Sequence, residues 1–174
     1  IGLQPVIVGE AGAGRGLIAQ RLVNAVQQAM DVCRGLGATP DQIRAAVGDC
    51  GLRPDLIATG DRPEVADRPN PAAATLPVRQ IAASVMAALT NTGAVLVSDG
   101  TARRPSDIDV VVQCLFDLRP EAGGPMFAAD RTGLLGLKGD LDVLEAASPG
   151  QWTLAPLLVD MIKYGGHFGE MNDP

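Results

Sequence analysis

Two stretches decide the fold of this chain: Gly37-Ala38-Thr39-Pro40-Asp41-Gln42-Ile43 and Gly100-Thr101-Ala102-Arg103-Arg104-Pro105-Ser106-Asp107-Ile108-Asp109. Each stretch follows a long apolar segment. It begins with a glycine and contains a proline a few residues later. Because glycine often ends a helix and proline favours the first turn of the next one, residues 17–47 and 78–112 both predict a long helix followed by a short one. A repeated supersecondary unit decides the architecture, so the sequence predicts a duplicated helical unit.

The two long helices are expected over residues 16–36 and 76–99. Apolar side chains recur in both at helical spacing, which gives each helix one buried stripe. The stripe positions are Ile18, Leu22, Val26, Met30 and Cys33 in the first helix and Ile81, Val85, Leu89 and Leu96 in the second. Thr39 is expected to cap the first short helix, with Pro40 at its first position and Gln42 completing a capping box.

Further helices are expected after Gly124-Pro125, over residues 140–147, and from Pro156 to the glycines at 165–166. Apart from a short apolar run at residues 5–8, nothing suggests a strand, so we predict an all-α fold, a two-lobed orthogonal bundle. Its parts are an N-terminal segment (1–15), a first helical lobe (16–59), an exposed linker (60–75) and a second helical lobe (76–174).

Composition excludes several classes of function. The 174 residues include 47% hydrophobic but only 3% aromatic residues, so the core must be aliphatic. A net charge of -6 without a basic run argues against nucleic acid as a partner. Three widely spaced cysteines without Cys/His ligand spacing predict no metal site and a reduced protein of the cytoplasm or of an organelle lumen. Of the two, we expect the cytoplasm of a bacterium. No uninterrupted apolar run is long enough to span a bilayer, and the initial Ile1 suggests a fragment.

The glycine-rich segment 9–16 has the outline of a phosphate-binding loop. Gly9 and Gly14 have the required spacing, but Arg15 and Gly16 replace the lysine and the metal-binding hydroxyl. The dinucleotide pattern also fails, because Leu17 stands where its third glycine belongs. We therefore interpret the segment as a flexible approach to the first helix and keep phosphate binding as the weaker alternative.

The titratable residues do not assemble a catalytic set on sequence grounds. His167 is the only histidine, and a lone histidine near a C-terminus is more often a surface or packing residue than a catalyst. Asp107 falls in the first turn of a helix, where a carboxylate caps the helix and favours its dipole. Asp109, Asp140 and Asp142 are expected to lie on solvated faces.

Several blocks of the second lobe carry a family resemblance. They are Asn91, Gly93, and residues 104–109, 123–130, 152, 155–158 and 165–168. In order and spacing, these blocks resemble the C-terminal helical region of NAD-dependent 3-hydroxyacyl-CoA dehydrogenases, especially the multifunctional enoyl-CoA hydratase/dehydrogenases of fatty-acid oxidation. The first lobe is similar through residues 16–22 and 38–43. The resemblance implies duplicated lobes of the 6-phosphogluconate dehydrogenase C-terminal-like fold.

The resemblance also implies roles for particular residues. Gln20 stands where the family has an active-site asparagine beside a His–Glu pair that a preceding NAD domain supplies. Structural roles are implied for the motif residues Arg21, Gly123, Gly124, Pro125, Asp130 and Pro156. The implied reaction is β-oxidation of a 3-hydroxyacyl-CoA to a 3-ketoacyl-CoA, with NAD bound by the preceding domain and no cofactor or turnover in this segment alone.

Two alternatives follow from this resemblance. In the first, the chain closes the acyl-CoA cleft of a dehydrogenase against the NAD domain, and a homodimer of the parent enzyme stays an open alternative. In the second, it is a helical dimerisation or scaffolding module of the same family that has lost catalysis. The second is motivated by Gln20 in place of asparagine and by the divergent turn at residues 52–55.

Overall fold

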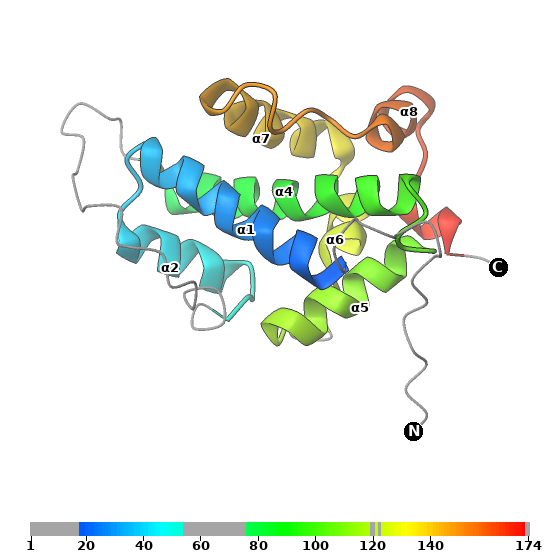
Figure 1. Ribbon diagram of the computed structural model, residues 1–174, viewed down its shortest axis with the longest axis horizontal. Coiled ribbons are helices and arrows are strands. Elements are labelled where there is room, and N and C mark those ends of the chain that lie inside the picture. Colours follow the sequence, from blue (N-terminus) through cyan, green and yellow to red (C-terminus); the bar gives the residue numbers. More distant parts are fainter. Residues whose placement is uncertain (1–17, 54–75, 119–120, 122, 173–174) are drawn as a thin grey trace.

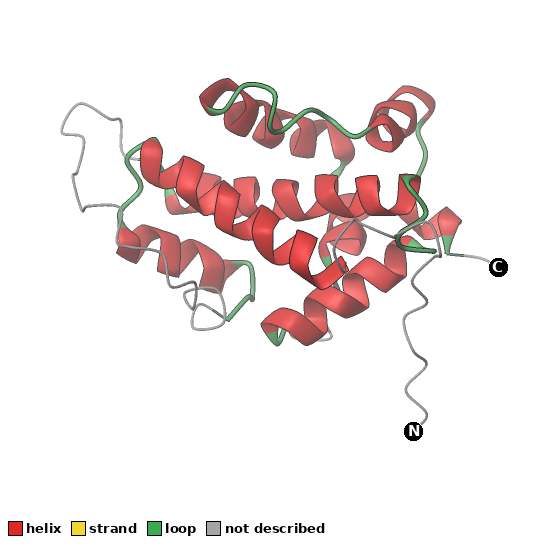
Figure 2. Cartoon of the chain, viewed as in Figure 1, coloured by secondary structure: helices red, strands yellow, loops and turns green. Residues whose placement is uncertain are grey.

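The computed structural model describes residues 18–53, 76–118, 121 and 123–172. Those residues form seven α-helices and one short 3-10 helix without a strand (Figure 2), which confirms the all-α prediction. The elements are α1 (Ile18–Gly35), α2 (Pro40–Asp49), α4 (Val78–Ser98), α5 (Pro105–Phe116), α6 (Pro125–Thr132), α7 (Leu134–Ala147), α8 (Pro156–Tyr164) and the 3-10 helix η3 (Phe168–Met171). The short apolar run at 5–8, the glycine-rich segment 9–16 and the linker at 60–75 lie outside the described residues.

Helix α4 lies at the centre of the bundle and contacts each of the six other α-helices in the described residues. Figure 1 shows α1 crossing one side of it, with α7 on another. Small residues allow this close packing: a Cβ atom on Gly93 would lie 2.8 Å from Met126 Sδ and 3.0 Å from Ile108 Cγ2. By length and composition alone α4 could cross a membrane, but 61% of its apolar window is buried inside the bundle, which accounts for its apolar character.

The duplicated plan of long and short helices is present in the structure. At one constant offset in sequence, the buried positions of α1 are matched by buried positions of α4: Ile18, Leu22, Ala25, Val26 and Cys33 by Ile81, Val85, Ala88, Leu89 and Leu96. The capping box of α2 forms as predicted, since Thr39 Oγ1 accepts from Gln42 N at 3.2 Å and Gln42 Oε1 accepts from Thr39 N at 2.9 Å. Both short helices begin at a proline.

The turns that follow the two short helices pack against each other. The sequence repeats here, with Leu52-Arg53-Pro54 after α2 and Leu118-Arg119-Pro120 after α5. Arg53 N donates to Phe116 O at 3.1 Å. Gly51 has a φ of +77°, and a Cβ atom on it would lie 2.9 Å from Leu118 Cδ1. The two copies therefore meet where their short helices end.

Helix α7 is longer than the sequence predicts. It begins at Leu134 rather than at residue 140, and its first half contains Gly136 and Gly139, which lower helix propensity. Packing against α4 and α6 stabilises this half, since Leu137 and Leu141 are buried. Tertiary contacts thus override the weak local preference. Helix α8 matches the prediction, from Pro156 to a left-handed C-cap at Gly165.

We predict that Gly51→Ala destabilises the chain by about 1–2 kcal/mol, because an L-residue is strained at positive φ and its Cβ would crowd Leu118. The matched control is Gly48→Ala, three residues earlier in the exposed face of α2, where a Cβ has open space. This control should gain about 0.5–1 kcal/mol from helix propensity. Urea unfolding followed by circular dichroism measures both changes, and equal effects of the two substitutions would contradict the prediction.

Candidate functional site

Asp109 binds the start of α6 rather than facing solvent, so its predicted solvated position is wrong. Its two carboxylate oxygens accept from Met126 N at 2.8 Å and Phe127 N at 3.1 Å. A Cβ atom on Gly124 would overlap the Asp109 side chain, which explains the glycine of the Gly123-Gly124-Pro125 block. Burial raises the pKa of Asp109 to about 6 against the opposing effect of the two amides, and the charge of Asp130 adds to the rise.

Asp130, on α6, holds the C-terminal 3-10 helix. Its oxygens accept from Phe168 N at 2.9 Å and Gly169 N at 2.8 Å. The side chain of His167 lies at the surface with 59% of its area exposed, and its Nδ1 is 3.8 Å from Asp130 Oδ1. Asp130 therefore joins α6 to η3, and His167 is the surface residue expected from sequence.

Asn91 positions the segment that leads into α8. Its Oδ1 accepts from Ala155 N at 2.8 Å, and its Nδ2 donates to Thr153 O at 3.1 Å. Pro156 follows in the first turn of α8. Asn91 is 6% exposed, so both bonds are made inside the bundle, where an unpaired backbone amide would be costly.

The predicted capping role of Asp107 is confirmed. Its Oδ2 accepts from Arg104 N at 3.1 Å, and its Oδ1 is 3.1 Å from Arg104 Nη2. Of the remaining carboxylates, Asp142 is 62% exposed beside Lys138, as expected for a solvated face, whereas half-buried Asp140 accepts from Gln80 Nε2 at 3.1 Å.

Arg21 joins α1 to the end of α4. Its Nη1 lies 3.0 Å from Asp99 Oδ2, at the C-cap of α4. Burial raises the pKa of Asp99, but hydrogen bonds from Thr101 and Arg21 outweigh this effect and lower the pKa to about 2. The partner of Arg21 is thus a carboxylate at the end of a neighbouring helix.

Gln20 lies on the exposed face of α1, away from the capping contacts just described. Its Nε2 donates to Asn24 Oδ1 at 2.9 Å, one turn further along the helix. The structure brings Gln20 together with this second amide, but no His, Cys or carboxylate of the described residues is hydrogen-bonded to it. Gln20 and Asn24 therefore form an exposed amide pair on one face of α1.

Cys33 and Cys50 are not poised for nucleophilic chemistry at neutral pH. Burial raises the pKa of the Cys33 thiol to about 11 and that of the Cys50 thiol to about 12. A thiol must ionise to act as a nucleophile or a metal ligand. Within the described ranges, no group of three His, Cys, Asp or Glu residues is arranged to hold a metal ion.

The capping contacts could not be found from sequence. Asn91, Asp109 and Asp130 each bind backbone amides that lie 17 or more positions away along the chain. Local capping leaves a signal three residues away, as at Thr39. A capping residue that comes from another helix has no fixed spacing in sequence from the amides it binds. Only the family resemblance drew attention to the blocks that contain these three residues.

We predict that Asp99→Asn destabilises the chain by about 1 kcal/mol at pH 7. The pKa of Asp99 is lowered in the folded state, so its stabilisation is present above its unfolded pKa, near 3.8, and is lost as pH falls through about 2. The difference between wild type and variant should therefore vanish below that pH. Urea titrations at a series of pH values measure it, with Asp142→Asn on the exposed face of α7 as control; a difference independent of pH would contradict the role of the charge.

Comparison with known proteins does not identify a relative. Protein-family models were searched and none matches the chain. The curated proteins also contain no match. The functional interpretation therefore depends on the residues and their geometry, together with the resemblance of their motif blocks.

Proposed function

We propose that this chain is the C-terminal, substrate-cleft and lobe-packing part of an NAD-dependent 3-hydroxyacyl-CoA dehydrogenase of β-oxidation, with lobes of the 6-phosphogluconate dehydrogenase C-terminal-like fold. The observation that carries the proposal is a difference between the motif residues: most of them are hydrogen-bonded to other helices, whereas one is exposed. Arg21, Asn91, Asp109 and Asp130 are occupied in joining helices. Gln20, at the position of the family's active-site amide, is exposed instead.

The amide pair on α1 has the hydrogen-bonding capacity that such a substrate requires. With Gln20 Nε2 donating to Asn24 Oδ1, the Oε1 atom of Gln20 and the Nδ2 atom of Asn24 are left for a ligand. The first can accept from a hydroxyl group and the second can donate to a carbonyl oxygen. A 3-hydroxyacyl thioester carries both groups, close together.

The described residues do not fit the nicotinamide cofactor itself. They contain no strand–glycine loop–helix unit, which a dinucleotide site of the expected kind needs. NAD accepts the hydride in such enzymes. Another domain would bind NAD and would supply the general base. We therefore derive no step through the cofactor, and the role proposed for this chain is to bind and orient the acyl substrate through Gln20.

The alternative function is a dimerisation or scaffolding module of the same family without catalysis. It is favoured by two large apolar side chains at the surface, since Leu135 on α7 is 74% exposed and Tyr164 on α8 is 73% exposed. Exposed apolar side chains of this size are common at protein interfaces. In this alternative, Gln20 has no chemical role.

We predict that Gln20→Ala, in the full-length gene product that carries this chain, lowers kcat/KM for a 3-hydroxyacyl-CoA by about tenfold to a hundredfold, because the substrate loses one orienting hydrogen bond. Gln20→Asn should retain most of the activity. Formation of NADH at 340 nm measures both, and the control is Arg44→Ala on the exposed face of α2.

Three results would separate the alternatives. NADH formation by residues 1–174 alone would overturn the proposal that another domain binds NAD. No activity in either the wild type or Gln20→Asn would favour the scaffolding alternative. Equal activity in Gln20→Ala and Arg44→Ala would leave the dehydrogenase in place but remove Gln20 from its site.

A further inference from the structure

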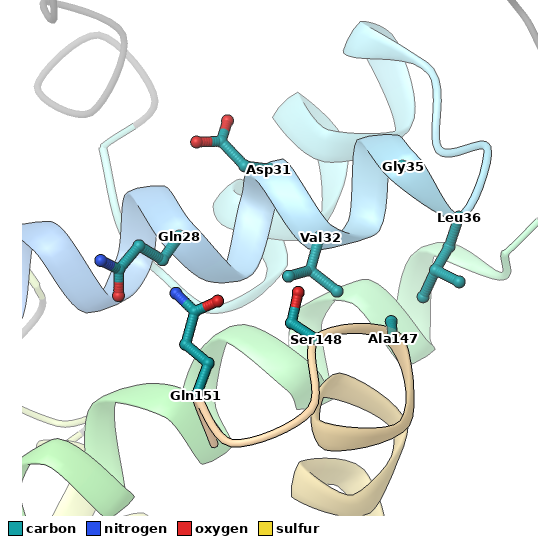
Figure 3. Close-up of a pocket in the computed structure, with 8 residues that line it drawn as sticks. All are labelled: Gln28, Asp31, Val32, Gly35, Leu36, Ala147, Ser148 and Gln151. Atoms are coloured by element: carbon teal, nitrogen blue, oxygen red, sulfur yellow. The ribbon is translucent and has the colours of Figure 1, made fainter.

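A cleft of about 550 Å³ separates the second half of α1 from the end of α7. Its volume falls within the range of small-molecule sites, about 300–1,000 Å³. The lining residues are Gln28, Asp31, Val32, Gly35 and Leu36 on the side of α1, and Ala147, Ser148 and Gln151 on the side of α7 and the loop that follows it (Figure 3). None of them belongs to the motif blocks, so the cleft is separate from the Gln20 site proposed above.

The two glutamines of the cleft are arranged to share a ligand. Figure 3 shows Gln28 and Gln151 pointing toward one another from opposite walls, with Ser148 beside them. Within the described part of the chain, none of these three side chains makes a hydrogen bond to another residue. Each carboxamide can both donate and accept, so the pair offers the complementary groups that a secondary amide requires.

Electrostatics narrows the chemical class of the ligand. Among the described residues, no basic side chain lines the cleft, which argues against phosphate and other anions. Asp31 is the one ionisable lining residue; its Oδ1 lies 2.6 Å from Arg34 Nη1, and in Figure 3 its carboxylate points away from the cleft. The nearby C-terminal end of α7 carries partial negative charge, which also disfavours anions and favours N–H donors.

The rest of the lining is apolar. Val32, Leu36 and Ala147 supply methyl groups beside the three polar side chains, and Gly35 leaves the wall open because a Cβ there would have no neighbour within 4 Å. Such a surface suits the short hydrocarbon links between successive amides. We propose that this cleft binds an uncharged, extended chain of secondary amides, which the Gln28 and Gln151 carboxamides hold from opposite sides.

Two sources could supply this chemistry: a peptide segment, or the amide arm of a thioester carrier such as pantetheine. The test is a titration of the 174-residue chain with pantetheine and, separately, with N-acetyl-triglycine amide, followed by amide chemical shifts in NMR. Shifts at the cleft with the first probe alone identify the carrier arm, and shifts with the second alone identify a peptide. Shifts with both support the shared amide chemistry.

Variants decide whether the cleft is the site. Gln28→Ala and Gln151→Ala should each weaken binding about threefold to tenfold, as expected for loss of a neutral hydrogen bond. Gln27→Ala is the matched control, because Gln27 is adjacent on α1 but does not line the cleft. Both target side chains are exposed, so the variants should keep the far-ultraviolet spectrum of the wild type. No binding of either probe, or binding that survives both substitutions together, would overturn the proposal, whatever the outcome for Gln20.

Discussion

The burial of α4 is the constraint on which the rest of the structure depends. With very few aromatic residues, the chain cannot fill a core with large side chains and must bring helices close together instead. Gly93, Ala87, Ala88 and Ala94 on α4 are all buried, and they permit neighbouring helices to approach from several directions. Close packing of this kind makes the interior sensitive to single methyl groups. The apolar composition of α4 thus follows from its role as the shared core of both copies.

Central burial of one helix creates a second requirement, because the shorter helices around it begin at points where their amides lose water. Asn91, Asp109 and Asp130 meet this requirement by accepting from those amides across helix boundaries. The residues that most resemble a functional motif therefore fix the geometry of the bundle. Two other places hold polar side chains that remain exposed. One is Gln20 on α1, and the other is the cleft between α1 and α7.

Much of the fold could be predicted from sequence because its signals are local. The capping box at Thr39, the helix starts at Pro105 and Pro156 and the apolar stripe of α1 all depend on residues a few positions apart. The start of α7 at Leu134 depends on packing against other helices, so the local sequence indicated this helix only from residue 140. The sequence predicted a solvated face for Asp109, because no residue close to it in sequence indicates that it binds the start of α6. Gln20 was found through resemblance alone, and its exposure is compatible with that role.

The contact between Arg53 N and Phe116 O joins residues far apart in the chain, and α1 likewise packs against a helix encoded well after it. Contacts of such long range slow folding, because loop-closure entropy must be overcome before they form. During synthesis, the first copy would leave the ribosome with its apolar stripe uncovered until α4 had followed. The nascent chain therefore has an interval in which the apolar side chains of α1 and α2 are open to aggregation.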